Sequence, residues 1–219
     1  MNLQTTFGSI DIYLFDQLLK GRIASGARIL DAGCGGGRNL LWLLKNGFDV
    51  SGVDTSADAV QSVRRLAAAF APHLPAEQFR VADIKQLPFE TASFHFVICS
   101  AVLHFAESED AFRRMVRECR RVLKPGGLFF ARLASTIGIE DRVELIEGRR
   151  YNLPDGSTRF LVDEQMLLQL TEEMSGQLVD PIKTTVVQGL RSMTTWVVQV
   201  EGDESKSRES KSRGSKSKA

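Results

Sequence analysis

The sequence predicts an α/β fold in which a mostly parallel sheet carries helices on both faces. Strand-like apolar runs alternate with segments of helical spacing from residue 27 to residue 134, the order expected of consecutive βα units. A glycine-rich turn, GCGGG at residues 33–37, follows the first of those runs, at the place where open α/β sheets bind ligands. The 219 residues suffice for one well-filled domain of this class and are too few for two.

Each element of that alternation has its own signals. Residues 10–23 carry apolar residues at helical spacing and precede the first strand. Gly47 ends the next helix as a C-cap, Ser56 is placed to cap the one after it, and Pro125 begins the turn into the fifth strand. We expect strands at 27–32, 48–54, 78–83, 94–102 and 128–134, with helices at 38–47, 57–70 and 109–124.

The pattern changes after residue 134. Residues 149–160 have the composition of a hairpin that turns at Pro154-Asp155-Gly156. Only a short turn separates the last two strand-like runs, so we expect them to pair antiparallel. The remaining elements are then a helix opened by Asp163, at 163–174, and strands at 178–188 and 192–200.

Composition excludes several classes of protein. Hydrophobic residues make up 43% of the chain and charged residues 25%, as in soluble globular proteins. No apolar run approaches a membrane span, and the first residues lack the basic and apolar regions of a secretory signal, so we expect neither membrane association nor export. Cys34, Cys99 and Cys119 suit neither a disulfide framework nor a metal-binding pair, which favours a cytoplasmic protein without a metal.

Residues 202–219 differ from the rest of the chain. They are rich in serine and carry six basic and three acidic residues, with no apolar residue except the terminal alanine. Such a segment buries too little surface to offset the entropy lost on ordering, so we expect a disordered basic tail. A solvated tail without a role is the simpler interpretation, and a weak tether to nucleic acid is the alternative.

The glycine turn and two carboxylates predict a nucleoside ligand. Asp31 ends the first strand and Asp54 ends the second, where a carboxylate can accept hydrogen bonds from both hydroxyls of a ribose. The dinucleotide fingerprint G-x-G-x-x-G fails in both registers, because Arg38 and Leu40 stand where its third glycine belongs. The P-loop motif is also absent, so we expect a nucleoside without a pyrophosphate.

Five stretches follow one another in a characteristic order: LDAGCGGGRN, GVD, VADIKQLPF, SFHFVICSAVLHF and RVLKPGGLFF, within residues 27–133. Together they resemble the motifs of class I S-adenosylmethionine-dependent methyltransferases, in particular the small-molecule branch of methyltransferase type 11 and tellurite-resistance-like proteins. The resemblance implies a Rossmann-like, mostly parallel seven-stranded sheet with an antiparallel last strand, in a domain spanning 1–201. It also implies S-adenosyl-L-methionine as the cofactor and S-adenosyl-L-homocysteine as its product.

The resemblance assigns one group of residues to the methionine end of the cofactor. Asp31 would help to hold the ammonium group, directly or through water. The backbones of Gly33 and Gly35 would lie against the methionine and ribose parts. Cys99, at the end of the fourth strand, would offer its backbone carbonyl near the ammonium.

A second group is assigned to the nucleoside end. Asp54 would accept hydrogen bonds from the ribose hydroxyls, with Thr55 beside it. Asp83 would accept from the adenine amine, while the backbone of Ile84 meets the ring edge. Any one of these carboxylates alone would be a common helix cap or turn residue. Their joint placement after three successive strands is what favours the cofactor site.

Methyl transfer from a sulfonium is an in-line displacement, so a protein contributes chiefly by aligning the acceptor and excluding water. A general base is required only where the acceptor must first lose a proton. His104, just after the fourth strand, is the candidate for that role. A histidine that only packs or supports the site is the simpler alternative.

The acceptor is expected to be a small molecule. Methyltransferases that act on nucleic-acid bases or glutamine amides carry an Asn/Asp-Pro-Pro-aromatic run after strand four, where this chain has CSAVLH. The insertion at 139–160 is the expected pocket wall, and it carries Arg149, Arg150, Tyr151 and Arg159. We name Arg149, Tyr151 and Arg191 as candidates to bind an anionic or aromatic acceptor, with a solvated charged hairpin as the alternative.

Other interpretations stay open. The chain would be an RNA methyltransferase if the basic tail recruited RNA, or a nucleoside-binding accessory protein if it bound the cofactor without turnover. Residues 7–20 form either a lid that orders over the cofactor or a permanently docked helix. Nothing in the sequence indicates the oligomeric state.

Overall fold

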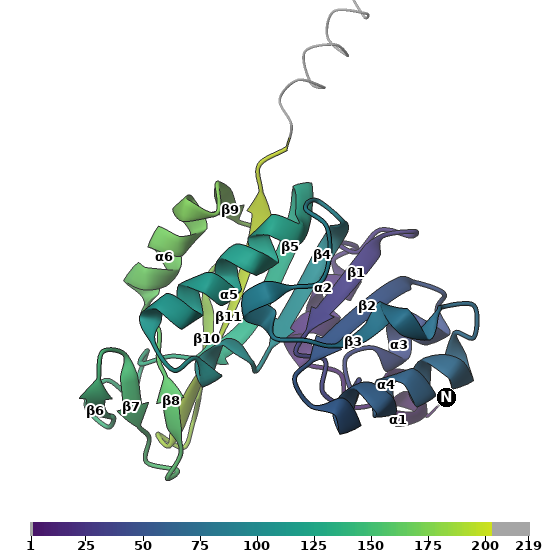
Figure 1. Cartoon of the computed structure of the whole chain (residues 1–219). Helices are drawn as coiled ribbons and strands as arrows, with labels where there is room; N and C mark the ends of the chain where they lie inside the picture. Colours follow the sequence, from purple (N-terminus) through teal and green to yellow (C-terminus); the bar gives the residue numbers. More distant parts are fainter. Residues whose placement is uncertain (1, 203–219) are drawn as a thin grey trace, which may run out of the picture.

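Five apolar segments lie next to one another as parallel strands, because their side chains are buried on both faces of the sheet. A computed structural model describes residues 2–202 of the chain (Figure 1). The main sheet has the order β10-β11-β5-β4-β1-β2-β3, with the short β9 paired to β11. Its strands are β1 Arg28–Ala32, β2 Asp49–Asp54, β3 Phe79–Val81, β4 Phe94–Ser100, β5 Leu123–Ala134, β9 Gly176–Leu178, β10 Lys183–Val187 and β11 Arg191–Val200.

The strand directions confirm the predicted fold class. The pairs from β3 to β5 are parallel, whereas β11 runs antiparallel to β5 and to β10. The chain order reverses between β1 and β4, so the carboxyl ends of the first four strands meet at one edge on either side of that reversal. The antiparallel β9 is an addition that the sequence pattern did not predict.

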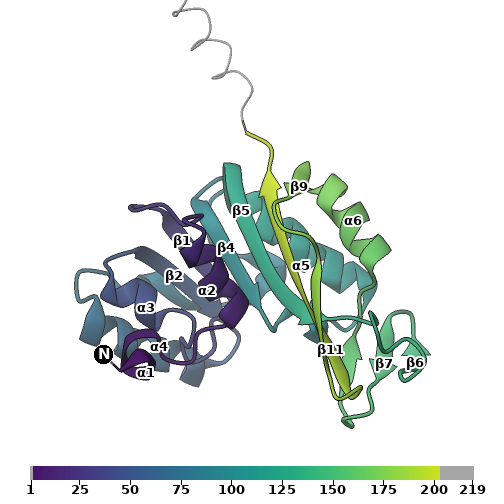
Figure 2. The ribbon, with the colours of Figure 1, turned by 180° about the vertical axis from the view of Figure 1, so that it is seen from behind.

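Alternating side chains divide the core between the two faces of the sheet. Leu30 and Val97 pack with α5 and α6 on one face, whereas Ile29 and Ile98 pack with α2, α3 and α4 on the other. Figure 1 shows α5 and α6 in front of the sheet, and Figure 2 shows α2 crossing its back. The helices are α1 Leu3–Phe7, α2 Ile12–Leu19, α3 Leu41–Lys45, α4 Ala57–Phe70, α5 Glu109–Val122 and α6 Glu164–Glu173.

Several elements differ in length from their predictions: the strand expected at 178–188 spans only Lys183–Val187, and the one expected at 78–83 spans only Phe79–Val81. The helix expected at 38–47 begins only at Leu41, because the residues before it belong to the glycine turn. The fifth strand begins at Leu123 rather than at residue 128, directly after α5, and its register against β4 shifts between Phe94 and Phe96. None of the described helices has the length and apolar character needed to cross a membrane.

The leading helix α2 is docked on the sheet. Asp11 caps it by accepting a hydrogen bond from the backbone N–H of Tyr13, and the helix buries Leu14 and Gln17 completely or nearly so. The Tyr13 hydroxyl lies 2.6 Å from the hydroxyl of Thr185 on β10. These contacts favour the docked interpretation of this helix over a lid.

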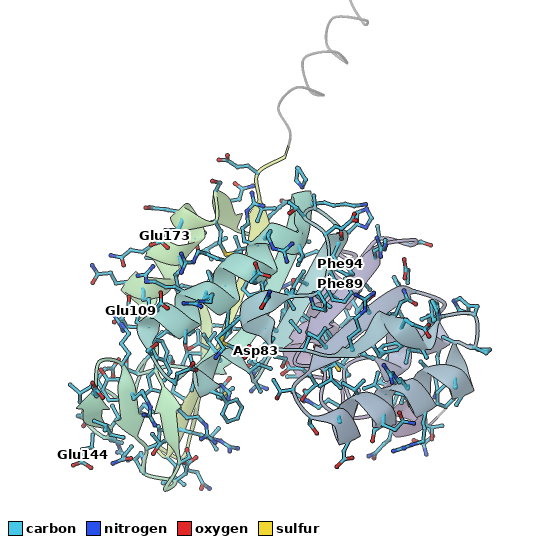
Figure 3. All side chains as sticks on the ribbon, viewed as in Figure 1. Asp83, Phe89, Phe94, Glu109, Glu144 and Glu173 are labelled. Atoms are coloured by element: carbon cyan, nitrogen blue, oxygen red, sulfur yellow. The ribbon has the colours of Figure 1, made fainter. Side chains whose placement is uncertain are left out.

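The insertion after β5 forms a separate three-stranded antiparallel sheet of β6 Glu144–Glu147, β7 Arg150–Asn152 and β8 Thr158–Phe160. The β7–β8 hairpin turns at the expected Pro154-Asp155-Gly156. Phe160 stacks on Phe112 of α5 with ring centroids 4.7 Å apart, which joins the small sheet to the main body. Figure 1 shows the small sheet beyond one end of the main sheet, and Figure 3 places Glu144 of β6 at its outer side. The expected disordered tail falls, apart from Gly202, outside the described residues.

Candidate functional site

A cavity of about 550 Å³ lies at the carboxyl edge of the first four strands. Its wall comes from the segments that follow β1, β2, β3 and β4, which parallel pairing brings to one edge. Six of the residues proposed for the cofactor line it: Gly33, Gly35, Asp54, Thr55, Asp83 and Ile84. The volume is in the range of small-molecule sites in proteins.

The glycine turn keeps this cavity open. Gly33 has a φ of +85°, and a Cβ there would lie 2.3 Å from the Val102 side chain. Gly35 has a φ of +50°, and nothing lies within 4 Å of the position its Cβ would take. The first glycine is therefore required by close packing, while the second leaves the backbone exposed to a ligand.

Asp54 fixes the turn from the end of β2. Its Oδ2 accepts a hydrogen bond from the backbone N–H of Gly35 at 2.9 Å, and its Oδ1 accepts one from the N–H of Ser56 at 2.9 Å. Each carboxylate oxygen keeps a second lone pair for a ligand hydroxyl. Thr55 lies between these contacts in the wall of the cavity.

Asp83 and Ile84 form the opposite part of the wall. Asp83 caps a short 3₁₀ helix, Ile84–Gln86, by accepting from the backbone N–H of Lys85 at 2.8 Å. Lys85 also lies 2.8 Å from a carboxylate oxygen of Glu107 across the cavity rim. In Figure 3, Asp83 lies between the α5 side and the α4 side of the molecule. Ile84 is buried and presents an apolar surface.

Asp31 is a buried carboxylate without a partner. Its residue is 1% exposed, and neither oxygen has a hydrogen-bond partner among the described residues. Burial raises its pKa to about 7, opposed by the charge of Arg38 and reinforced by that of Asp54. A buried, unsatisfied anion costs free energy unless a cation or a donor reaches it. The residue therefore suits a ligand with an ammonium group.

Cys99 does not line the cavity. It is fully buried in β4 with its thiol against Cys119, and the wall begins instead with Ser100 and Ala101. The strand continues for one residue beyond the position expected to meet the ligand. Cys99 is therefore outside the cavity wall although it lies close to Asp31, and the role expected of its backbone carbonyl stays a prediction.

A buried polar network beneath the cavity was not predicted. The carboxylate of Asp11, whose side chain is fully buried, accepts from the Ser100 hydroxyl at 3.2 Å and from Arg132 at 3.0 Å. Arg38 of the glycine turn lies 3.7 Å from the same carboxylate oxygen. The N–H of Asp11 donates to the amide oxygen of Asn39 at 3.0 Å. An acidic residue just before an apolar helix, as at Asp11, predicts a helix N-cap. It does not predict the distant residues, Ser100 and Arg132, that Asp11 also contacts.

A second cavity of about 290 Å³ adjoins the first and shares Ala101 with it. Ala101 has a φ of +63°, a left-handed conformation that is strained for a residue other than glycine. Its N–H donates to the carbonyl of Arg132 at 2.7 Å, which holds the turn in place. The charged and polar side chains around this second cavity are His104, Arg132, Asp155, Ser157, Arg159 and Arg191.

His104 faces the second cavity as a neutral ring. Its Nδ1 accepts a hydrogen bond from the backbone N–H of Ala134 at 3.3 Å. Burial, with a smaller effect of the Arg159 charge, lowers the pKa of His104 to about 4. At neutral pH the single ring proton is therefore on Nε2, so His104 is arranged as a hydrogen-bond donor rather than as a proton acceptor.

The insertion contributes other residues than expected. Arg149 lies outside both cavities, where it donates to Asp163 at 2.8 Å, and Tyr151 packs in a small apolar cluster with Leu153 and Leu161. Of the three proposed acceptor residues only Arg191 lines the second cavity, and Arg159 joins it there.

The sequence has relatives among methyltransferases. Residues 30–131 match the methyltransferase domain family. The malonyl-[acyl-carrier protein] O-methyltransferase of Enterobacter lignolyticus is 36% identical over 111 residues, which cover 50% of this chain and 40% of that protein. The ubiquinone biosynthesis O-methyltransferase of Xanthomonas oryzae is 33% identical over 107 residues, covering 48% and 42%. The matched part of this chain thus covers less than half the length of each of these relatives.

The fold also has close structural neighbours. The crystal structure of 1,6-didemethyltoxoflavin-N1-methyltransferase from Burkholderia thailandensis, with 1,6-didemethyltoxoflavin and S-adenosylhomocysteine bound, superposes with a TM-score of 0.67. It is 20% identical, and the match covers 92% of this chain and 82% of that one. With the strand order, the glycine turn and the match of residues 30–131 to the methyltransferase domain family, this likeness shows that the chain has the fold of the class I S-adenosylmethionine-dependent methyltransferases.

Proposed function

We propose that the protein transfers a methyl group from S-adenosylmethionine to a small-molecule acceptor. The observation that carries the proposal is Asp31, a buried carboxylate with no partner among the described residues; it is not itself in the cavity wall, but it stands two positions before Gly33, where that wall begins. The ammonium group of the cofactor would supply the missing charge. A structural carboxylate would instead be paired within the fold, as the buried Asp11 is.

The other end of the cavity suits a nucleoside. Asp54 keeps free lone pairs for two ribose hydroxyls, and Ile84 offers an apolar surface against which a base can lie. Asp83 is an acceptor at the rim for an exocyclic amine. The guanidinium of Arg38 lies in the wall near Asp31 and would meet the carboxylate of the amino-acid part.

Bound S-adenosylmethionine would supply an activated methyl group on a positively charged sulfur. The protein's part is then to hold the acceptor in line and exclude water, and such alignment is worth effective molarities of about 10⁵–10⁸ M. Ala101, which lies between the two cavities, fixes the place where cofactor and acceptor meet. His104 donates from Nε2 and orients an acceptor oxygen or nitrogen.

The relatives support a small-molecule acceptor over the alternatives. Their names specify methyl transfer to malonyl-[acyl-carrier protein] and in ubiquinone biosynthesis. The second cavity is of small-molecule size. An accessory protein without turnover would not need the strained Ala101 between two adjoining cavities.

Ligand binding tests the cofactor site. S-adenosylhomocysteine is expected to raise the thermal midpoint, whereas NAD at the same concentration is not, because a ligand stabilises only the state that it binds. Asp54→Asn is expected to weaken binding about tenfold or more, since charged hydrogen bonds contribute about 1.5–3 kcal/mol. Asp58→Asn, in the exposed first turn of α4, is the matched control.

Turnover separates the enzyme from an accessory protein. Incubation with S-adenosylmethionine and an extract of small metabolites is expected to form S-adenosylhomocysteine, and the same reaction with purified RNA is not. Binding of the cofactor with no product from either source would favour the accessory protein. Product from RNA alone would favour the RNA methyltransferase.

A further inference from the structure

We propose that the second cavity binds the acceptor through a carboxylate, so that the substrate is a small organic acid with an apolar body. This inference rests on the proposed methyl transfer and adds the chemical class of the acceptor. Its basis is the arrangement of two arginines, Arg159 and Arg191, around a cavity that is otherwise partly apolar.

The two arginines come from different parts of the fold. Arg159 lies on β8 of the insertion, and Arg191 begins β11 at the turn from β10. Both line the cavity, although 31 positions of sequence separate them. A guanidinium is always charged and presents paired N–H donors that match a carboxylate, which makes two of them around one small cavity an anion site.

The third arginine of the cavity is already paired. Arg132 donates to Asp11 at 3.0 Å and shares that carboxylate with Arg38, while its buried Nε has no partner among the described residues. Arg159 donates one N–H to the carbonyl of Thr158 at 2.7 Å, and its guanidinium lies over the Phe105 ring, 4.8 Å from the ring centroid. These two contacts fix the direction of the Arg159 side chain. Arg191 is paired through its backbone with Val187 of β10, whereas its guanidinium has no hydrogen-bond partner among residues 2–202. Donors on both side chains thus stay available to a ligand.

The carboxylate already in the cavity wall does not fill this site. Asp155 accepts from the N–H of Ser157 at 3.0 Å and from its hydroxyl at 2.6 Å. These bonds lower the pKa of Asp155, and the charges of Arg191 and Arg159 contribute to the same direction. No hydrogen bond joins Asp155 to either arginine within the described residues. One negative charge beside two positive charges leaves the pair of arginines with a net attraction for an anion.

The rest of the wall requires an apolar body. Leu153, Val187 and Met193 line the cavity with Ala134. A volume of about 290 Å³ admits a molecule of a single ring or a short chain. Because Ala101 belongs to both cavities, an acid held by the arginines extends its other end toward the cofactor.

Binding to the protein saturated with S-adenosylhomocysteine tests this inference. The probes are benzoate, 3-phenylpropionate and hexanoate, each compared with its uncharged amide by isothermal titration calorimetry. At least one acid is expected to bind about tenfold more tightly than its amide, the effect of one charge-assisted contact. Arg191→Gln is expected to remove most of that difference.

Arg150→Gln is the matched control. It removes the same charge, and Arg150 lies outside the cavity wall, on the small sheet that also carries Arg159. Arg159→Gln provides a second test, with circular dichroism to show that the insertion stays folded without the Phe105 contact. Equal affinity for acids and amides, or equal losses in Arg191→Gln and Arg150→Gln, would overturn the inference. If S-adenosylhomocysteine itself does not bind, the proposed function fails instead.

Discussion

At the scale of single residues, two buried aspartates show opposite solutions to the cost of burying a charge. Asp11 is satisfied by a hydroxyl and an arginine drawn from distant strands, which makes it part of the fold. Asp31 is left without a partner and holds a pKa of about 7. The first arrangement stabilises the folded state, and the second stores a penalty that a cationic ligand relieves.

Asp31→Asn is expected to stabilise the ligand-free protein while weakening cofactor binding. A carboxyl whose folded pKa is raised from 3.8 to about 7 destabilises the fold as pH rises through that interval, by about 4 kcal/mol at most. A buried unpaired amide costs about 1–3 kcal/mol, so a net gain of about 1–2 kcal/mol is expected at pH 8. The gain should vanish near pH 5. Urea unfolding at both pH values measures it.

The same substitution tests the ligand role of Asp31. Affinity for S-adenosylhomocysteine is expected to fall about tenfold or more, because the ammonium group loses its anion. The wild-type affinity should also weaken as pH falls below about 7, where Asp31 is protonated in the free protein, and the variant should lose this dependence. A variant with unchanged affinity and the same pH profile would remove Asp31 from the site.

Asp11→Asn is expected to destabilise the protein by about 3 kcal/mol, the cost of breaking a buried ion pair on one side. The loss should be at the lower end of that class because the Arg38 and Arg132 side chains are 45% and 23% exposed. Asp16→Asn, on the exposed side of the same helix, is the control and should cost less than about 1 kcal/mol. Equal losses in the two variants would show that the network contributes nothing beyond a surface pair.

At the scale of elements, α2 and the three-stranded insertion decide how the site is enclosed. Leu14 lies in the core beneath α2, and Gln17 donates to Asp180 at 3.0 Å across the loop after β9. The insertion is joined to α5 through the stacked rings of Phe160 and Phe112. Helix α2 therefore covers the back of the sheet, while the three-stranded insertion forms the outer wall of the second cavity.

Hydrogen exchange distinguishes a docked helix from a lid. Because α2 buries Leu14 and Gln17 against the rest of the fold, amides in residues 12–19 are expected to be protected in the free protein. Adding S-adenosylhomocysteine should change their exchange little, while exchange in the glycine turn at 33–37 slows. Strong new protection confined to residues 12–19 would instead restore the lid.

At the scale of the whole molecule, one sheet organises both cavities. The chain reversal between β1 and β4 gathers the cofactor residues, and the antiparallel β11 carries Arg191 to the same edge. Strand β11 ends at Val200, where the described sheet is complete. Everything the proposed function uses therefore lies within residues 2–202.

Removing residues 203–219 is expected to leave the thermal midpoint and the affinity for S-adenosylhomocysteine unchanged, because the composition of this segment offers no apolar side chain to pack except the terminal alanine. Differential scanning calorimetry and titration measure the two quantities. An accompanying filter assay with RNA at low and high salt examines the tail. RNA binding that depends on the tail and supports methylation would favour the RNA methyltransferase.

The sequence by itself determined the strand alternation, the glycine turn and the carboxylates at three strand ends. Those features depend on local spacing: apolar periodicity marks each element, and parallel strands place their carboxyl ends at one edge. The sequence therefore predicts Gly33, Gly35, Asp54 and Asp83 as ligand-site residues, and the structure places all four around one cavity.

Only the tertiary structure decided which distant side chains meet. Asp11 pairs with Arg132, and Arg159 and Arg191 line one cavity, because the strand order and the docking of the insertion place these residues. Arg149 was an equal candidate by composition, yet Asp163 holds it elsewhere at 2.8 Å. The residues proposed for the cofactor thus follow from local sequence, whereas those proposed for the acceptor depend on packing between segments far apart in the chain, which no local pattern records.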